Sequence, residues 1–274
     1  MSGARVVGIA RESLYSPGDF EAADRGILEA TGRVLTEHGV EVKIVEADTP
    51  LAAFEGARLV FAMCQGPAAL ETLRALVRAG HTLVHEAEAI EACHRVQLVP
   101  KLAEADLPRP EAHLVTSGAP EPEPLAWVDA QGDAGAWVKR GDVHATQEGD
   151  VRRVRGVDEA RKALGELAAR GVELAVLEAH APGRTVKFYA VRGTGFFRAY
   201  PEGGTELNDP PQAWRDVADR AAEALGLAVY GGDVVVDASG NALVVDVNDW
   251  PSFSRCREAA AQAIAGHLLE RLRS

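Results

Sequence analysis

The sequence predicts an α/β fold that begins with a βαβ domain and continues into a part with antiparallel strands. Over residues 1–90, short apolar runs of strand length alternate with segments of helical spacing, a pattern typical of a parallel sheet covered by helices. Near the C-terminus, two strand patterns flank the turn sequence Ala238-Ser239-Gly240-Asn241, which predicts a hairpin. An apolar content of 47% over 274 residues is enough to bury a core.

The N-terminal elements follow one another in a regular order. The strongest helix pattern, over residues 19–38, has apolar residues at helical spacing and stops at Gly39. A second helix over residues 67–79 has Pro67 at its start and Gly80 just after its end, which is the expected asymmetry. No GxGxxG sequence follows the first strand, so a dinucleotide site is not expected there. The expected strands are 5–10, 40–45, 59–63 and 82–85.

The rest of the chain mixes the two patterns. A helix expected over residues 91–105 ends before Pro108 and Pro110, because each proline disfavours a helical residue before it. Residues 118–124 are rich in proline and glutamate and predict a surface loop. Further helices are expected at 158–170, 211–225 and 254–272, and further strands at 137–139, 174–178, 186–192, 195–199, 229–237 and 242–247.

The composition argues against several classes of protein. A net charge of −12 is unsuited to a nucleic-acid surface, which needs clustered Lys and Arg. No apolar run approaches the roughly 18 residues of a membrane span, and no signal segment begins the sequence. We therefore expect a cytoplasmic protein with no nucleic-acid or membrane partner. Cys64, Cys93 and Cys256 form no CxxC pair, which argues against a zinc site or a disulfide framework.

Three oxygen-bearing side chains stand out in the C-terminal hairpin. Asp233 lies on its first strand, and Asp246 and Asn248 lie on its second. Residues two apart on a strand point to the same face, so Asp246 and Asn248 point together. Acids among buried valines are costly unless something pairs with them. Hard oxygen ligands on one face suit Mg²⁺, although two capped or solvent-facing strand ends account for the same residues.

The segments Gly231-Gly232-Asp233 and Val245-Asp246-Val247-Asn248-Asp249-Trp250-Pro251 resemble the C-terminal metal motif of the ATP-grasp superfamily. In that motif, an acid on one strand is followed by an acid-x-Asn sequence on the next strand and then by a proline turn. The resemblance implies that Asp233, Asp246 and Asn248 hold one or two Mg²⁺ ions against the phosphates of ATP.

The same resemblance implies a domain organisation. An N-terminal α/β pre-ATP-grasp domain over residues 1–90 precedes a two-lobed α+β ATP-grasp module over residues 91–274. The small lobe is expected at residues 105–180 and the large lobe at residues 181–274, with ATP between them. Homodimers are common among such enzymes, although no interface can be read from the sequence.

Other positions extend the resemblance along the module. Arg95 matches a residue that contacts ATP phosphates, and Lys139 matches a strand lysine that contacts the α-phosphate. Lys187 matches a strand residue that faces the phosphates, and Arg198 matches an arginine near the transferred phosphoryl group. Both are candidate catalytic residues, and the planar fork of an arginine suits that task. The interdomain hinge, whose backbone binds adenine in the family, corresponds to Glu178, Ala179, His180 and Ala181.

Two features depart from the superfamily pattern. A glycine-rich phosphate loop is common after the first phosphate-binding lysine, but residues 141–149 of this chain have only two glycines and place His144 in the middle. His144 is a candidate contact to a phosphate or an anionic substrate. Ser252 and Arg255 follow the metal motif, where the acceptor substrate often binds, but Pro251-Ser252 replaces the common Pro-Gly.

The resemblance predicts an enzyme that uses Mg-ATP, and three functions remain open. Most of the superfamily joins a carboxylate to an amine through an acyl-phosphate, so a ligase acting on a small molecule or a peptide is the first expectation. Members similar to the ribosomal-protein glutamate ligase usually have Glu where Asp246 stands. Inositol-trisphosphate kinases have Asp there, and Arg95 and His144 also fit that branch, so phosphotransfer to a hydroxyl group is the alternative. A nucleotide-binding protein without turnover is the third.

Overall fold

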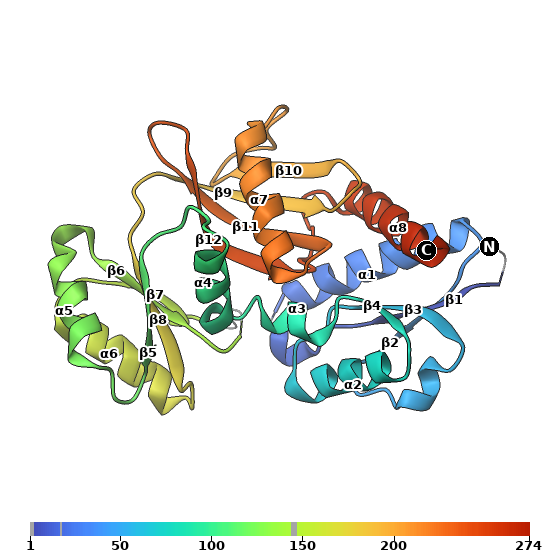
Figure 1. Ribbon diagram of the computed structural model, residues 1–274, viewed down its shortest axis with the longest axis horizontal. Coiled ribbons are helices and arrows are strands. Elements are labelled where there is room, and N and C mark those ends of the chain that lie inside the picture. The colour runs from blue at the N-terminus through green and yellow to red at the C-terminus, as the bar shows by residue number, and fades with distance from the viewer. Residues whose placement is uncertain (1–2, 17, 144–146) are drawn as a thin grey trace.

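Three four-stranded sheets form the framework of the protein in the computed structural model (Figure 1). It describes residues 3–16, 18–143 and 147–274. The first sheet is parallel and the other two are antiparallel, so the α/β class with a following α+β part is confirmed. None of the helices within these ranges combines the length and the apolar content of a membrane span.

The first sheet is built from the N-terminal third of the chain. Its elements are β1 (Arg5–Ile9), α1 (Phe20–Glu37), β2 (Glu41–Val45), β3 (Ala57–Ala62), α2 (Pro67–Arg78) and β4 (Thr82–Val84), with short 3-10 helices at Ser13–Tyr15 and Leu51–Phe54. The strand order is β2-β1-β3-β4. Successive side chains of a strand point to opposite faces, so Val6 packs in the core with α1 and Val7 packs in the core with α2. Helices therefore cover both faces, as expected for a parallel sheet.

The second sheet has helices on one face. Its elements are β5 (Ala112–Thr116), α5 (Pro122–Ala130), β6 (Ala136–Arg140), β7 (Val151–Val154), α6 (Gly156–Ala169) and β8 (Leu174–Ala179), with a 3-10 helix at Gly132–Ala134. The strand order is β5-β8-β6-β7. Val138 and Leu177 pack with Leu164 of α6 on the covered face. Lys139 and Glu178, one residue further along their strands, point to the other face.

The third sheet carries the predicted hairpin. Its elements are β9 (Arg184–Val191), β10 (Phe196–Pro201), α7 (Gln212–Leu225), β11 (Val229–Val236) and β12 (Ala242–Asp249). The helices α3 (Ala87–Glu91) and α4 (Arg95–Glu104), which precede β5 in the chain, also pack here. The strand order is β10-β9-β11-β12. Phe188 and Val234 pack with Leu98 of α4 and Leu225 of α7 on one face. The antiparallel pairing of β11 with β12 confirms the hairpin.

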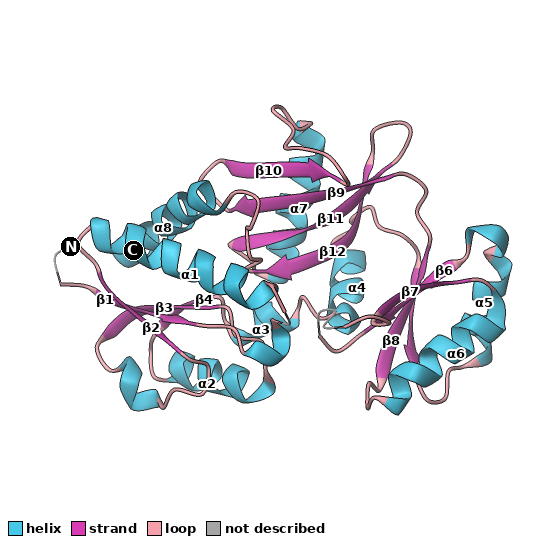
Figure 2. Cartoon of the chain, turned by 180° about the vertical axis from the view of Figure 1, so that it is seen from behind, coloured by secondary structure: helices cyan, strands magenta, loops and turns pink. Residues whose placement is uncertain are grey.

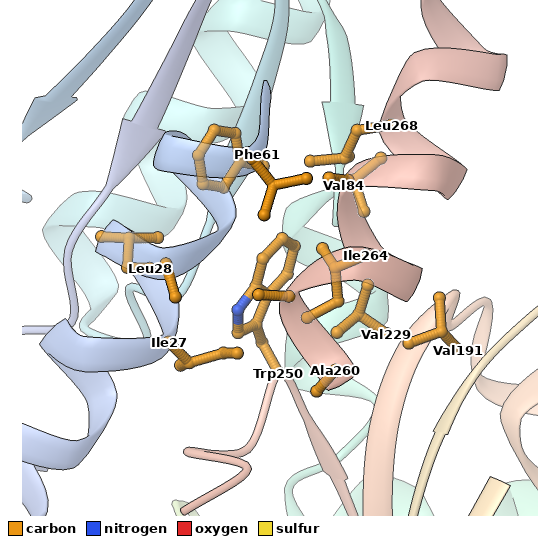
Figure 3. Close-up of a cluster of buried hydrophobic side chains, with 14 of the residues drawn as sticks. Ile27, Leu28, Phe61, Val84, Val191, Val229, Trp250, Ala260, Ile264 and Leu268 are labelled. Carbon is orange, nitrogen blue, oxygen red and sulfur yellow. The ribbon is translucent and has the colours of Figure 1, made fainter. Parts of the chain in front are cut away.

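The last helix, α8 (Arg257–Arg273), brings the end of the chain back to its beginning. It packs beside α1 on the first sheet (Figures 1 and 2). Trp250 is fully buried, and its ring stacks on that of Phe61 with centroids 5.5 Å apart. Figure 3 shows Trp250 among Ile27, Leu28 and Ile264. The third sheet is thus anchored in the core of the first, and the boundary of the N-terminal domain at residue 90 stays a prediction.

Two expected helices begin later than the sequence predicts. The helix expected over residues 91–105 is interrupted, because His94 has an extended backbone and α4 begins at Arg95. The closing helix begins at Arg257 rather than at residue 254, because its N-cap residue Cys256 has a non-helical backbone with φ −148° and ψ 30°. The first shift places Arg95 at the beginning of a helix that packs between the second and third sheets.

Candidate functional site

Four side chains form one row across the third sheet. Asp233 on β11 lies opposite Lys187 on β9 and opposite Asp246 on β12. Tyr200 on β10 lies opposite Lys187 on its other side. Directly opposed residues share a face of a sheet, and their side chains interact. The sheet therefore brings two predicted metal ligands and one predicted phosphate-binding residue together.

Each carboxylate of this row has a cation beside it. Lys187 Nζ lies 3.0 Å from Asp233, and a terminal guanidinium nitrogen of Arg95 lies 2.7 Å from Asp246. Like charges directly opposite each other destabilise a sheet, and the two cations offset that repulsion. Burial raises the pKa of Asp233, and Lys187 opposes the shift. Residues predicted to bind phosphate are thus neutralised by residues predicted to bind metal.

The second sheet contributes a third ion pair. Lys139 Nζ lies 2.5 Å from Glu178 Oε1 and 3.4 Å from the backbone oxygen of Val245 on β12. Burial raises the pKa of the Glu178 carboxyl group, and Lys139 opposes the shift. Arg95 also reaches the second sheet, where it donates to the backbone oxygen of Arg140 at 3.2 Å. The sequence assigns only the backbone of Glu178 a role, whereas the structure gives its carboxylate a buried partner.

A cavity of about 330 Å³ lies between the second and third sheets and is termed the interlobe cavity. Its charged residues are Arg95, Lys139, Glu178, Asp233 and Asp246. Its apolar residues include Trp137, Val151, Val235 and Val245. A site that combines apolar walls with a few convergent charged groups is typical of small-molecule binding.

The predicted hinge lines the same cavity. Glu178 and Ala179 end β8, and His180 and Ala181 follow directly. The indole nitrogen of Trp137 donates to Nδ1 of His180 at 3.3 Å. Burial lowers the pKa of His180, which favours the neutral ring that can accept this hydrogen bond. Trp137 had no predicted role, and its alternation with the buried Ala136 and Val138 is the signal that could have placed it on the open face.

A larger cavity of about 640 Å³ lies between the N-terminal part and the third sheet and is termed the N-terminal cavity. The predicted site residues that line it are Lys187, Asp233, Asn248, Ser252 and Arg255. Thr185 and Asp233 line both cavities. The two cavities therefore meet at the row of side chains on the third sheet.

The N-terminal part supplies residues of this cavity that the sequence did not reveal. Arg11 lies 2.9 Å from Asp24 and donates to the backbone oxygen of Trp250 at 3.0 Å. Gln65 Nε2 donates to Asp249 at 3.1 Å. These contacts attach the turn after the predicted metal ligands to the first sheet. Arg11 and Gln65 follow β1 and β3, and the carboxyl ends of parallel strands are where ligands usually bind, which is the signal that could have found them.

Two predicted residues, Arg198 and Arg255, make contacts outside the ion pairs described above. Arg198 lies on the edge strand β10, where its Nε is 2.8 Å from Glu206, and it lines neither cavity as described. The guanidinium of Arg255 lies 4.3 Å over the ring of Tyr200 at the wall of the N-terminal cavity. His144 lies outside the described residues, so its role stays a prediction.

The predicted metal ligands suit magnesium by their chemistry. The described part of the chain has no cluster of three or more His, Cys, Asp or Glu side chains arranged for a metal ion. The predicted set instead combines the carboxylates of Asp233 and Asp246 with the amide of Asn248. Mg²⁺ usually takes one or two carboxylates and completes its octahedron with water and substrate phosphates, so this set fits it. A structural zinc site needs four Cys or His ligands and does not fit.

No protein-family model matches the sequence, and no curated protein matches it either. Solved structures match the whole chain. A RimK-domain ATP-grasp protein from Sphaerobacter thermophilus is 21% identical, with a TM-score of 0.70, over 97% of this chain and 100% of that one. D-alanyl-alanine synthetase A from Vibrio cholerae is 13% identical, with a TM-score of 0.73, over 100% and 98%. A D-alanine–D-alanine ligase from Bacillus anthracis complexed with ATP is 12% identical, with a TM-score of 0.74, over 99% and 99%.

Proposed function

The chain has the ATP-grasp fold, and on this basis we propose that it is an ATP-dependent carboxylate–amine ligase. The observation that carries the proposal is the position of Asp233, which lines both cavities and pairs with Lys187. Phosphoryl transfer requires the nucleotide and the acceptor to approach each other in line. Two cavities that meet at one row of charged side chains support that arrangement.

The interlobe cavity is the proposed nucleotide site. Its apolar residues suit a nucleotide base, and the backbone of residues 179–181 suits hydrogen bonding to adenine. The proposed partners of the phosphates are Arg95, Lys139 and Lys187, and the proposed ligands of one or two Mg²⁺ ions are Asp233, Asp246 and Asn248. The metal supplies charge neutralisation on the transferred phosphoryl group.

Binding at this site is an exchange of partners. Arg95, Lys139 and Lys187 each have a carboxylate within ion-pair distance. Asp233 and Asp246 would hold the metal, and the two cations that they release, Lys187 and Arg95, would bind the phosphates. A partly buried charge that loses its partner without gaining another is costly. The metal and the nucleotide are therefore expected to bind together.

The proposed reaction uses ATP as its only activating reagent. A carboxylate oxygen of the acceptor, held in the N-terminal cavity, attacks the γ-phosphorus of ATP, and ADP leaves with the bridging oxygen. The nitrogen of the amine then attacks the acyl-phosphate carbon, loses a proton to solvent, and displaces inorganic phosphate. Lys187 offsets the negative charge where the two cavities meet. Arg198 is the proposed second cation. It would leave its ion pair with Glu206 and interact with the negative charge that develops on the transferred phosphoryl group.

The charges of the N-terminal cavity favour a ligase over a kinase for polyphosphorylated compounds. Among the described residues that line it, the Lys and Arg side chains are Arg11, Lys187 and Arg255. Arg11 and Lys187 are already paired with Asp24 and Asp233. A substrate with several phosphate groups needs an excess of cations, whereas a single carboxylate needs one or two donors. The D-alanine ligases among the similar structures are named for joining such small carboxylates.

The proposal is tested by incubating the purified protein with Mg-ATP and pools of carboxylates and amines, and by measuring ADP and free phosphate. A ligase releases free phosphate only when an acid and an amine are both present. ADP without free phosphate, together with a phosphorylated hydroxyl compound, contradicts the ligase and establishes a kinase. ATP binding without turnover in any pool supports a non-catalytic nucleotide-binding protein. The Asp246→Ala variant serves as the inactive control.

A further inference from the structure

Aromatic rings gather on the wall of the N-terminal cavity. Three of the four tyrosines of the chain, all of them described residues, line it, and Phe20 lies with them. The tyrosines are Tyr15, Tyr189 and Tyr200. Aromatic residues make up only 5% of the sequence, so this concentration sets the cavity apart from the rest of the molecule. We infer that one of the two substrates of the ligation carries an aromatic or other large apolar group, which lies against this wall.

Two of the rings have positions that are fixed by the core. Tyr189 packs edge-on against Tyr200 with ring centroids 5.8 Å apart, and it lies 5.3 Å from the ring of Phe253. Tyr189 and Tyr200 are 5% and 3% exposed. Their packing makes them a rigid part of the wall, and a preformed wall suits a ligand of defined shape.

The other two aromatic residues are not required by the core. Phe20 begins α1 and is 64% exposed, and Tyr15 is partly exposed at the end of the 3-10 helix before it. Apolar surface at the edge of a cavity gains free energy when a ligand removes it from water. Packing within the fold therefore does not explain why Phe20 and Tyr15 lie at this cavity, whereas contact with an apolar ligand does.

Four of the charged side chains that line the cavity form two ion pairs and are already held by each other, while Glu202 and Arg255 line it as well. Arg11 and Asp24 neutralise each other, and their side chains are only 10% and 6% exposed. Lys187 and Asp233 form the second pair, at the end where phosphoryl transfer is proposed. A charged side group on the substrate would need an opposite charge that is not already held by a neighbour. An apolar group makes no such demand.

The inference rests on the proposed ligase function, and a substrate panel tests it directly. Amino acids and dipeptides with Phe, Tyr, Leu, Ala, Glu or Lys side chains are offered as acid and as amine with Mg-ATP, and ADP and phosphate release are measured. We expect kcat/KM to be about 10-fold or more higher for the Phe, Tyr or Leu compounds, because a single apolar contact in a pocket contributes on that scale. A higher kcat/KM with the Glu, Lys or Ala compounds overturns the inference and leaves the ligase function intact.

A matched pair of variants distinguishes a side chain that contacts the substrate from one that is only exposed to solvent. Leu14 is 74% exposed and precedes Phe20 by six positions, but it lines neither cavity as described. Phe20→Ala is expected to raise KM for the preferred apolar substrate about 10-fold and to leave KM for Mg-ATP unchanged. Leu14→Ala is expected to change neither constant. Equal effects of the two substitutions, or no effect of Phe20→Ala, overturn the inference.

A binding measurement keeps the inference testable if no pair is ligated. Saturation-transfer NMR with L-phenylalanine and the dipeptide Phe-Phe, in the presence of Mg-ADP, compares the wild type with the Phe20→Ala and Leu14→Ala variants. Binding that is weakened by Phe20→Ala alone supports the inference, and missing turnover then counts only against the ligase proposal. Failure of both compounds to bind, together with no turnover of the apolar compounds, overturns the inference.

Discussion

The two cavities differ in what holds their side chains in place. In the interlobe cavity, ion pairs hold the side chains in place. Arg95 on α4 pairs with Asp246 on β12, and Lys139 on β6 pairs with Glu178 on the neighbouring strand β8. In the N-terminal cavity, one wall consists of packed aromatic rings. The contacts of Arg11 and of the buried Trp250 attach this wall to the first sheet. Exchangeable charges suit a ligand that brings its own charges, such as a nucleotide with metal. Rigid packing suits a ligand that is selected by shape.

The largest expected effect concerns Asp233, because it lines both cavities. Asp233→Asn removes one carboxylate from the proposed metal site and releases Lys187 from its partner. We expect kcat to fall by at least about 100-fold, on the scale of other lost electrostatic contacts to a reacting group. Steady-state ADP release measures this. Asp216→Asn, on the exposed side of α7, is the matched control; a similar loss in both variants would mean that position 233 has no special role.

The second prediction separates structure from binding in the interlobe cavity. Lys139→Met leaves the buried carboxylate of Glu178 without its partner, which is expected to cost about 3 to 5 kcal/mol of unfolding free energy. Adding Glu178→Leu replaces the pair by apolar side chains and is expected to restore most of that stability. Urea denaturation measures the first effect, and calorimetry measures ATP affinity. Recovery of ATP affinity in the double variant would contradict the assignment of Lys139 to the phosphates.

The third prediction concerns pH and the attachment of the N-terminal part. His85 Nε2 accepts hydrogen bonds from the backbone N–H groups of Ala228 and Val229 at 2.9 and 3.0 Å. Burial lowers the pKa of His85 from 6.5 to about 4. The unfolded chain therefore binds the proton first, so stability is full above the unfolded pKa and falls as the pH drops toward the folded one. The loss amounts to about 3 kcal/mol.

His85→Gln checks this prediction because glutamine retains an acceptor but does not titrate. Urea denaturation of both proteins between pH 7 and pH 4 gives the slope of stability with pH. The variant is expected to have the smaller slope. Parallel slopes would show that another group causes the acid sensitivity.

The smallest expected effect concerns the support of the N-terminal cavity. Asp24→Asn weakens the ion pair that positions Arg11, and Arg11 in turn donates to the backbone oxygen of Trp250. We expect KM for the acceptor to rise about 10-fold, equivalent to about 1.4 kcal/mol, with KM for ATP unchanged. Glu46→Gln breaks an exposed ion pair with Arg25 and is expected to change neither KM. A rise in KM for ATP alone would contradict the division of roles between the cavities.

The C-terminal hairpin, which carries the predicted metal ligands, could be predicted because its information is local. Asp246 and Asn248 are two residues apart on one strand, and the turn that pairs this strand with Asp233 follows directly from the sequence. The cation that neutralises Asp246 is Arg95, which is 151 residues away. A sequence gives the residue type at such a position but not which carboxylate it meets, so the ion pairs could not be predicted.

The parts of the fold that escaped prediction have weak local patterns. β7 reads Val-Arg-Arg-Val and β5 reads Ala-His-Leu-Val-Thr. Neither sequence has the apolar alternation that signals a strand. Residues 118–124 predict a loop, yet α5 begins at Pro122, because proline is well tolerated in the first turn of a helix. The N-terminal cavity escaped for another reason, since Arg11 and Gln65 become neighbours of the third sheet only through tertiary packing.

The predicted phosphate-binding residues Arg95 and Lys187 pair with predicted metal-binding acids, and we expect both ion pairs to break only when nucleotide and metal bind together. Calorimetric titration of ATP with and without Mg²⁺, into the wild type and the Asp246→Asn variant, tests it most directly. We predict that Mg²⁺ tightens ATP binding to the wild type by about 10-fold or more, and that Asp246→Asn loses this dependence while binding metal-free ATP at least as tightly as the wild type. Equal metal dependence in both proteins would contradict the claim.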